Sequence, residues 1–293
     1  MLDWLYAGFR WVYELLFSVT GNFILSAVLM TLIIRLIMLP LDLRTSRSTR
    51  KQLRLQPVIE DINRKYANDA ERRNQKTMEL YKKEKYNPLS GCLPLLLTWP
   101  LFLVLFNTLR QVASEQVLLM YQSMACGVVP PVTGFLWIHN IWQADSFLNM
   151  PVIPQLAQLT SLAVVKNHAI LTPENIAAVR AGYDTIMRPL IQNYAAINNG
   201  WLILPVLCSG VSLLTMRLNP MYKAQNNAPP DPNKKGGMNT KLMQYMGPIM
   251  SLIVCVSANT IFTFYWLTSN VWELGKQYVL NKTIFKPATE ETK

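Results

Sequence analysis

One run of apolar residues, long enough to cross a lipid bilayer, restricts most strongly how this chain folds. Residues 21–41 include FILSAVLMTLIIRLIMLPL and contain a single charged side chain, Arg35. At 1.5 Å per residue, about twenty helical positions extend about 30 Å, the thickness of one hydrocarbon core. The whole chain is 51% hydrophobic and 15% charged, with a net charge of +11. Because soluble domains carry roughly 25% charge, this composition predicts an all-α membrane protein with basic loops.

Other apolar runs predict further transmembrane helices, which gives five spans in all. The additional spans cover residues 89–112, 200–218, 241–257 and 259–280. The last two form one apolar stretch that is too long for a single span, so we divide it near Ser257-Ala258-Asn259. Residues 1–20 mix aromatic and leucine side chains with three charges, which predicts an amphipathic helix lying in the membrane interface.

The charged residues gather between these spans. Residues 42–88 hold thirteen Lys and Arg and seven Asp and Glu, which predicts a charged helical hairpin that turns near Tyr66-Ala67-Asn68-Asp69 and is broken or kinked at Pro57. The polar loop 219–240 and the tail 281–293 are also basic. Residues 113–199 hold few basic residues and predict an outer loop with extra helices, one of them starting near Thr172. Basic loops stay in the cytoplasm, so we expect the N-terminus outside and the C-terminus inside.

Arg35 is the charge that needs an explanation. It lies about 20 Å into the first span by helical rise, where a charge is costly and by default marks a functional site. The alternative is an arginine whose head reaches the cytoplasmic headgroups. Thr31 lies one turn earlier on the same face. Other polar residues at comparable depths predict a hydrated cavity around Arg35, although hydrogen bonding between helices is the alternative for each one; they include Asn107, Ser209, Ser212, Thr215, Tyr265, Thr268, Ser269 and Asn270.

The fifth span also contains an acid, Glu273, at about the depth of Arg35. Two pairings are open: an ion pair with Arg35, which would weaken its pull on acidic ligands, or a pair with Lys276 three residues later on the same helix.

Motifs for catalysis or metal binding are missing from the sequence. It contains no HExxH, GxSxG or Walker motif, and its four cysteines show no CxxC spacing. We therefore expect no enzymatic activity, no metal site and no cofactor. A transporter or channel with Arg35 as an anion site, and a scaffold that assembles other membrane proteins, remain as alternatives.

Four segments carry a resemblance to a known family. They are IIRLIMLPL at 33–41, NPLSGCLPLL at 87–96, FLWIHNIWQAD at 135–145 and FTFYWLTSNVWELGKQYVLNK at 262–282. In this order they resemble the YidC/Oxa membrane insertases in their short five-span bacterial form. The resemblance implies five helices around a hydrophilic groove that is open to the cytoplasm and to lipid. Together with the polar residues above, it gives a predicted substrate groove of Arg35, Thr31, Asn107, Ser212, Tyr265, Trp266 and Asn270.

The resemblance also implies partners and a location. It implies nascent membrane proteins as substrates, the lipid bilayer, the ribosome and the Sec translocon as partners, no small-molecule substrate, and a multi-pass position in the bacterial plasma membrane. The chain departs from the family pattern in several places, among them Thr98, where glutamine is frequent, and Glu273, at a position that is usually uncharged. Its outer segment 146–198 is longer than in the short form, and Ala258-Asn259-Thr260 stands where Pro-Ala-Gly is usual.

Overall fold

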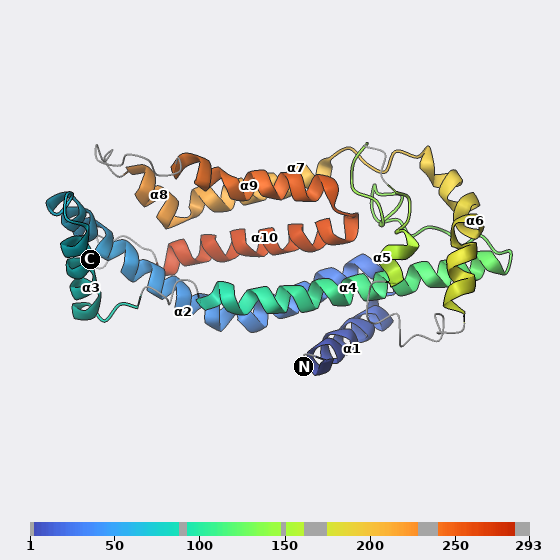
Figure 1. The fold of residues 1–293 in the computed structure, drawn as a ribbon, viewed down its shortest axis with the longest axis horizontal. Coiled ribbons are helices and arrows are strands. Elements are labelled where there is room, and N and C mark those ends of the chain that lie inside the picture. The colour runs from blue at the N-terminus through green and yellow to red at the C-terminus, as the bar shows by residue number, and fades with distance from the viewer. Residues whose placement is uncertain (1–2, 88–92, 148–150, 161–174, 228–239, 285–293) are drawn as a thin grey trace. The chain divides into compact units, whose positions relative to one another are not determined.

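The computed structural model describes residues 3–87, 93–147, 151–160, 175–227 and 240–284. These residues form helices connected by turns, with one isolated bridge between Phe135 and Ile138, so the prediction of an all-α chain is confirmed for them (Figure 1). Several predicted features lie outside the described residues: the start of NPLSGCLPLL, the helix start at Thr172, residues 228–239 of the polar loop, and the end of the tail.

One compact unit consists of residues Met1–Thr31, Leu101–Ser209 and Met250–Thr268. It contains α1 (Asp3–Thr20), the start of α2 (Phe23–Lys65), most of α4 (Leu93–Ala125), α5 (Leu156–Thr160), α6 (Ile176–Ala195), and parts of α7 (Ile203–Leu218), α9 (Thr240–Ser257) and α10 (Thr260–Thr283). We call it the first unit.

In the first unit, α4 and α6 pack together through buried side chains. Leu118 of α4 and Met187 of α6 are fully buried. Tyr121 of α4 stacks on Tyr183 of α6 with ring centroids 5.7 Å apart, and the Tyr183 hydroxyl donates to the backbone oxygen of Pro154 at 2.9 Å. Burying these large side chains is the main force that holds α6 on α4.

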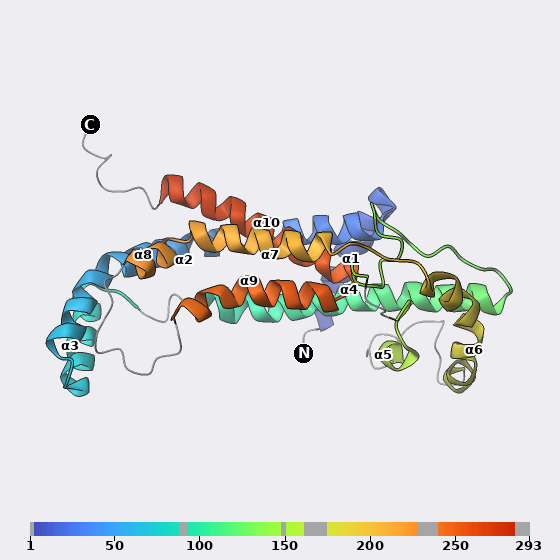
Figure 2. The same cartoon turned by 90° about the horizontal axis from the view of Figure 1, so that it is seen from above.

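The second unit consists of residues Leu32–Pro100, Gly210–Ile249 and Ser269–Lys293. It holds the rest of α2, α3 (Ala70–Lys83), α8 (Pro220–Asn227), and the remaining parts of α7, α9 and α10. In this unit α3 lies beside the end of α2 (Figures 1 and 2). Lys51 of α2 donates hydrogen bonds to the backbone oxygens of Glu84 and Lys85 at the end of α3, and Asp69 caps the start of α3 by accepting from the Arg72 amide at 3.0 Å.

Two helices continue past the ends of the predicted spans. The helix of the first span does not end near residue 41, because α2 continues to Lys65 and includes the first half of the charged segment. It also passes through Pro57 without a break, which excludes one of the two predicted alternatives there, a break or a kink. A proline removes one hydrogen bond from the ladder, but propagation is favourable once a helix is long, so α2 continues. In the same way α4 runs to Ala125, beyond the predicted end of the second span.

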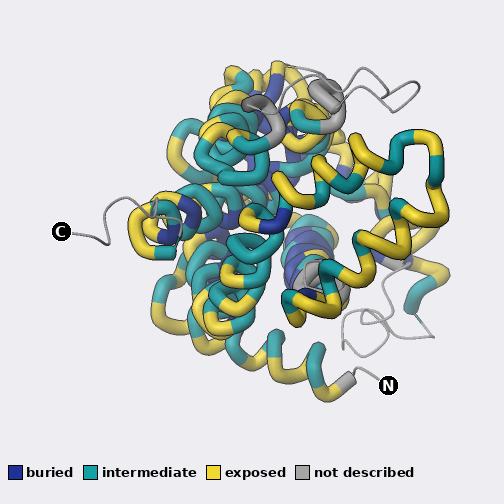
Figure 3. Tube along the Cα trace, turned by 90° about the vertical axis from the view of Figure 1, so that its left-hand side faces the viewer, coloured by how far each residue is buried: buried dark blue, intermediate teal, exposed yellow. Residues whose placement is uncertain are grey.

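Most helices mix buried, intermediate and exposed positions (Figure 3), whereas α3 has no buried residue. Of the described helices, α2 alone combines the length and the apolar composition needed to cross a bilayer, while α7 and residues Gln244–Ser257 are apolar but shorter. The set of five spans and its loop boundaries therefore stay predictions.

Candidate functional site

The seven residues of the predicted groove divide between the two units. Arg35, Ser212 and Asn270 belong to the second unit, and Thr31, Asn107, Tyr265 and Trp266 belong to the first. We describe each group within its own unit.

Arg35 is half-buried on α2 and makes no hydrogen bond or ion pair with any residue that the structure describes. A guanidinium carries five N–H donors and is always charged. Inside an apolar helix such a group must meet water, a lipid headgroup or an acidic partner. Ser212 on α7 and Asn270 on α10 are likewise half-buried.

An ion-pair network lies two turns beyond Arg35 on the same helix. The Lys276 ammonium of α10 lies 2.9 Å from Asp42 of α2 and 2.6 Å from Glu273. The side chains of Asp42 and Lys276 are each only 12% exposed, so the pair is well shielded from solvent. Of the two pairings predicted for Glu273, the structure shows the one with Lys276. The charge of Arg35 is therefore not neutralised by Glu273.

The pair of Asp42 and Lys276 also fixes the register between α2 and α10, which run in the same direction (Figures 1 and 2). Arg35 precedes Asp42 by seven residues, and Ser269 precedes Lys276 by seven. Seven residues are close to two helical turns, so Arg35 and Ser269 lie at similar depth, each about two turns before its helix's member of the pair. The Ser269 hydroxyl is buried and has no hydrogen-bond partner among the described residues.

A second polar atom of this part of α10, the indole nitrogen of Trp272, is also buried without a partner among the residues that the structure describes. Buried polar groups are nearly always hydrogen-bonded to protein or water. The unpaired groups of Arg35, Ser269 and Trp272 are therefore what a site filled by water or by a polar ligand requires. The sequence predicts Ser269 among the polar residues of a hydrated cavity around Arg35, and the ion pair of Asp42 and Lys276 gives it a depth similar to that of Arg35.

In the first unit two of the predicted residues are engaged with their neighbours. Thr31 is 1% exposed, and its hydroxyl donates to the backbone oxygen of Ala27 at 2.7 Å. Asn107 of α4 donates to the hydroxyl of Tyr6 on α1 at 3.2 Å. The first contact stays within α2 and the second joins α4 to α1, so the role of both residues in a groove stays a prediction.

The aromatic pair of α10 lies in a cluster of rings. Tyr265 is buried and lies 5.9 Å from Phe102 between ring centroids. Trp266 donates its indole N–H to the hydroxyl of Ser251 on α9 at 2.8 Å, which joins α9 to α10 just after the turn between them.

A buried carboxylate that the sequence did not single out organises the outer part of the first unit. Asp145, the last residue of FLWIHNIWQAD, is fully buried. It accepts hydrogen bonds from the backbone amides of Trp201 at 2.8 Å and Leu204 at 2.7 Å, and from the indole of Trp137 at 3.3 Å. The first amides of a helix have no partner within it, so Asp145 caps α7 from a distance in sequence. Gly200 permits this approach, because a Cβ there would collide with the carboxylate.

Helix α1 is held against α4 by charge. The Arg10 guanidinium contacts both carboxylate oxygens of Glu115, at 2.5 and 3.0 Å, and also pairs with Glu14. Burial lowers the pKa of Arg10, but its hydrogen bonds with Glu115 and Glu14 outweigh this effect and leave the pKa above its ordinary value. The helix also exposes Trp4 and Trp11, seven residues apart on one side.

The described residues form helices, and one of them is long and apolar enough to cross a bilayer with a charged residue inside it, which is the pattern of a helical membrane protein. The chain belongs to the family of the 60Kd inner membrane protein, whose model matches residues 15–287. The resemblance to the YidC/Oxa insertases is thereby confirmed.

Several curated relatives carry the name membrane protein insertase YidC. The chain is 39% identical to the protein of Fusobacterium nucleatum over 133 residues, which are 45% of this chain and 57% of the relative. It is 33% identical to the protein of Clostridium perfringens over 152 residues, 52% of this chain and 58% of the relative. It is 25% identical to the protein of Leptospira interrogans over 275 residues, 94% of this chain. The chain spans between 33% and 58% of the length of these relatives.

Proposed function

We propose that this protein inserts other membrane proteins into the bilayer, with Arg35 as the charge that attracts the hydrophilic part of each substrate. One observation carries the proposal. Within the second unit, a half-buried arginine of an apolar helix has no partner among the described residues, and a buried serine hydroxyl at similar depth on α10 also lacks one. The membership in the 60Kd inner membrane protein family and the names of the relatives support the same activity.

The physical task of an insertase explains why such a site is useful. Moving a hydrophilic tail across about 30 Å of hydrocarbon would leave its charges and backbone polar groups without partners. A polar groove that reaches partway into the membrane shortens this path. At an effective dielectric constant of about 20, a cation attracts a carboxylate about 4 Å away by about 4 kcal/mol. The apolar part of the substrate then leaves sideways into lipid, and its burial drives the step.

The arrangement in the membrane is part of the proposal. Five spans surround the groove, with the N-terminus outside and the basic segments, including the hairpin of α2 and α3, in the cytoplasm. Helix α1 lies in the outer interface, where its exposed face of Trp4, Trp11 and Leu15 meets the headgroup boundary. Nascent membrane proteins are the substrates. The ribosome and the Sec translocon are further partners, and the positive charge of the cytoplasmic segments favours their binding.

Insertion into liposomes that contain only this protein tests the activity. The substrate is a single-span reporter with a short acidic N-terminal tail, and protection of the tail from added protease measures insertion. Arg35→Ala should lower the initial rate by roughly 5–30-fold, the equivalent of about 1–2 kcal/mol, while Arg35→Lys should retain most of it. Arg44→Ala removes an exposed arginine of the same helix and should leave the rate unchanged.

A reporter with a neutral tail separates the role of the charge from the activity itself. We expect the wild-type protein and the Arg35→Ala variant to insert this reporter at the same rate. If the wild-type protein inserts no reporter but conducts or exchanges anions across the liposome membrane, the chain is a transporter or channel and the proposal is wrong.

A further inference from the structure

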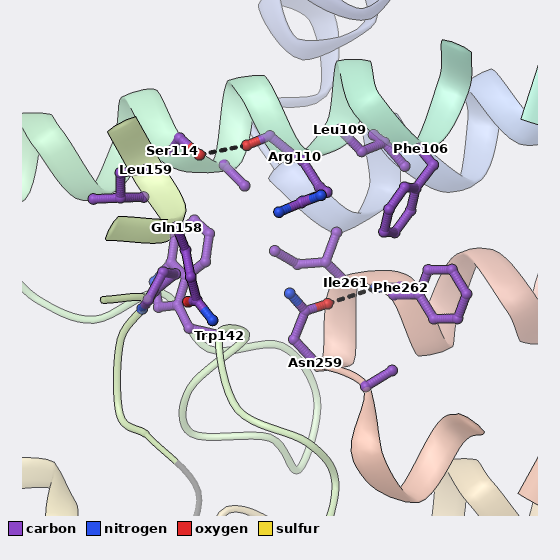
Figure 4. A pocket seen from close by; sticks show the side chains of 13 residues that line it. Phe106, Leu109, Arg110, Ser114, Trp142, Gln158, Leu159, Asn259, Ile261 and Phe262 are labelled. Carbon is purple, nitrogen blue, oxygen red and sulfur yellow. Dashed lines mark hydrogen bonds between the residues drawn. The ribbon is translucent and has the colours of Figure 1, made fainter. Parts of the chain in front are cut away.

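A cavity of about 300 Å³ lies in the first unit, between α4, α5 and the turn that joins α9 to α10 (Figure 4). Pockets that bind small ligands range from roughly 300 to 1,000 Å³, so this cavity holds a headgroup or a comparable small group. It belongs entirely to the first unit and contains none of the residues of the predicted groove.

Two unused hydrogen-bond donors point into the cavity. Arg110 reaches in from α4, with its guanidinium 5.5 Å from the centre of the Phe106 ring, and it makes no ion pair or side-chain hydrogen bond with any described residue. Asn259 enters from the start of α10 (Figure 4). Its side-chain oxygen accepts from the Phe262 amide at 3.0 Å, which fixes the orientation of the amide group. The amide nitrogen of Asn259 is therefore left as a donor without a described acceptor.

The electrostatics of the cavity favour an anion. Arg110 supplies a full positive charge, and none of the described residues that line the cavity is acidic. Helix α10 begins at Thr260, so the positive end of its dipole lies at the cavity wall beside Asn259. A phosphate accepts hydrogen bonds from a guanidinium and from amide N–H groups with good geometry.

The rest of the cavity wall is apolar, which specifies what the anion is attached to. Leu109, Leu159, Ile261 and Phe262 present hydrocarbon to the space. Trp142 is 6% exposed, and its indole N–H is buried without a partner among the described residues. A free inorganic anion gains nothing from such walls, whereas an amphiphile places its phosphate at Arg110 and its hydrocarbon along the rings.

We propose that this cavity binds an anionic phospholipid, with the headgroup phosphate held by Arg110 and Asn259 and the upper part of the acyl chains held against the apolar wall. Pro154, Gln158 and Leu159 of the outer segment 146–198 close one side of the cavity. This segment is longer than in the short family form, and its role in our proposal is to complete the lipid site. The proposal does not depend on the insertase activity.

Native mass spectrometry of the purified full-length protein tests it. The protein, stripped of lipid in detergent, is titrated with phosphatidylglycerol and, in parallel, with phosphatidylcholine. We expect tighter binding of phosphatidylglycerol, and we expect Arg110→Gln to weaken that binding about tenfold. Trp142→Phe, which keeps an apolar ring but removes the N–H group, should weaken it less. The matched control is Arg180→Gln, which removes an exposed arginine of α6 that does not line the cavity, and it should bind like the wild type.

A competition experiment with inorganic phosphate distinguishes a site for phospholipid from a site for a free anion. Phosphate added at a large molar excess over the lipid should displace little phosphatidylglycerol. Equal affinity of wild type and Arg110→Gln for phosphatidylglycerol overturns the proposal, as does full displacement by phosphate or equal binding of the two lipids by the wild type. The last two comparisons use only wild-type protein, so they test the lipid site even if a substituted protein fails to fold.

Discussion

Removing the carboxylate of Asp145 is expected to release the start of α7 from the outer part of the first unit. Two of the hydrogen bonds it accepts are short, 2.8 Å from the Trp201 amide and 2.7 Å from the Leu204 amide. Hydrogen bonds to a charged group contribute about 1.5–3 kcal/mol each, so Asp145→Ala removes about 3–6 kcal/mol before any relaxation. The third bond, from Trp137 at 3.3 Å, is long and adds less.

Hydrogen exchange of the two amides measures this loss directly. The Leu204 amide belongs to a fully buried residue, so its exchange in the wild type requires local opening of the structure. A loss of about 3 kcal/mol speeds exchange by roughly 150-fold, since each 1.4 kcal/mol is a factor of about ten. Asp145→Asn keeps one acceptor oxygen and should fall between alanine and the wild type. Asp184→Ala removes an exposed aspartate of α6 in the same unit and serves as the control.

One result would refute the hypothesis that the Asp145 carboxylate caps the start of α7. If the Leu204 and Trp201 amides of Asp145→Ala exchange as slowly as those of the wild type, while its total helicity is unchanged, the carboxylate does not hold α7. A general loss of protection across α4 and α6 as well would show that Asp145 stabilises the whole first unit rather than one helix end.

Three further perturbations follow from the contacts described above. A double-mutant cycle of Arg10→Gln and Glu115→Gln should give a coupling of about 1–2 kcal/mol in denaturant unfolding, because the pair is bidentate but Arg10 is partly exposed; additive effects would show that α1 is held by packing alone. Lys276→Met leaves Asp42 shielded without its cation and should destabilise the protein by about 2–4 kcal/mol, an effect that Asp42→Asn in the same chain should partly reverse. Gly200→Ala should lower the thermal midpoint of unfolding, since the new methyl group overlaps the carboxylate that caps α7; an unchanged midpoint would show that the turn shifts without cost.

Local patterns of the sequence were enough to predict the helices and the family of this protein. Periodic and continuous apolar runs predict helices because each helix satisfies its own backbone within the segment, and the described part of the chain is helical. The division at Ser257-Ala258-Asn259 coincides with the end of α9 and the start of α10. Helix ends were less accurate, as α2 and α4 show, because a charged sequence of good helix formers can extend an apolar helix without any local signal.

The helical class, the segregation of charge, the family and the prediction of a site at Arg35 all follow from residues that are close together in the chain. Which groups meet follows from the packing of helices that are far apart in it. Asp42 and Lys276 are separated by 234 positions, and Asp145 and Leu204 by 59, so no local spacing relates them. Glu273 could reach two cations by sequence, and in the folded chain it pairs with Lys276. That pairing leaves Arg35 without a partner among the described residues, because the partners of a side chain depend on which helices pack against its own and in what register.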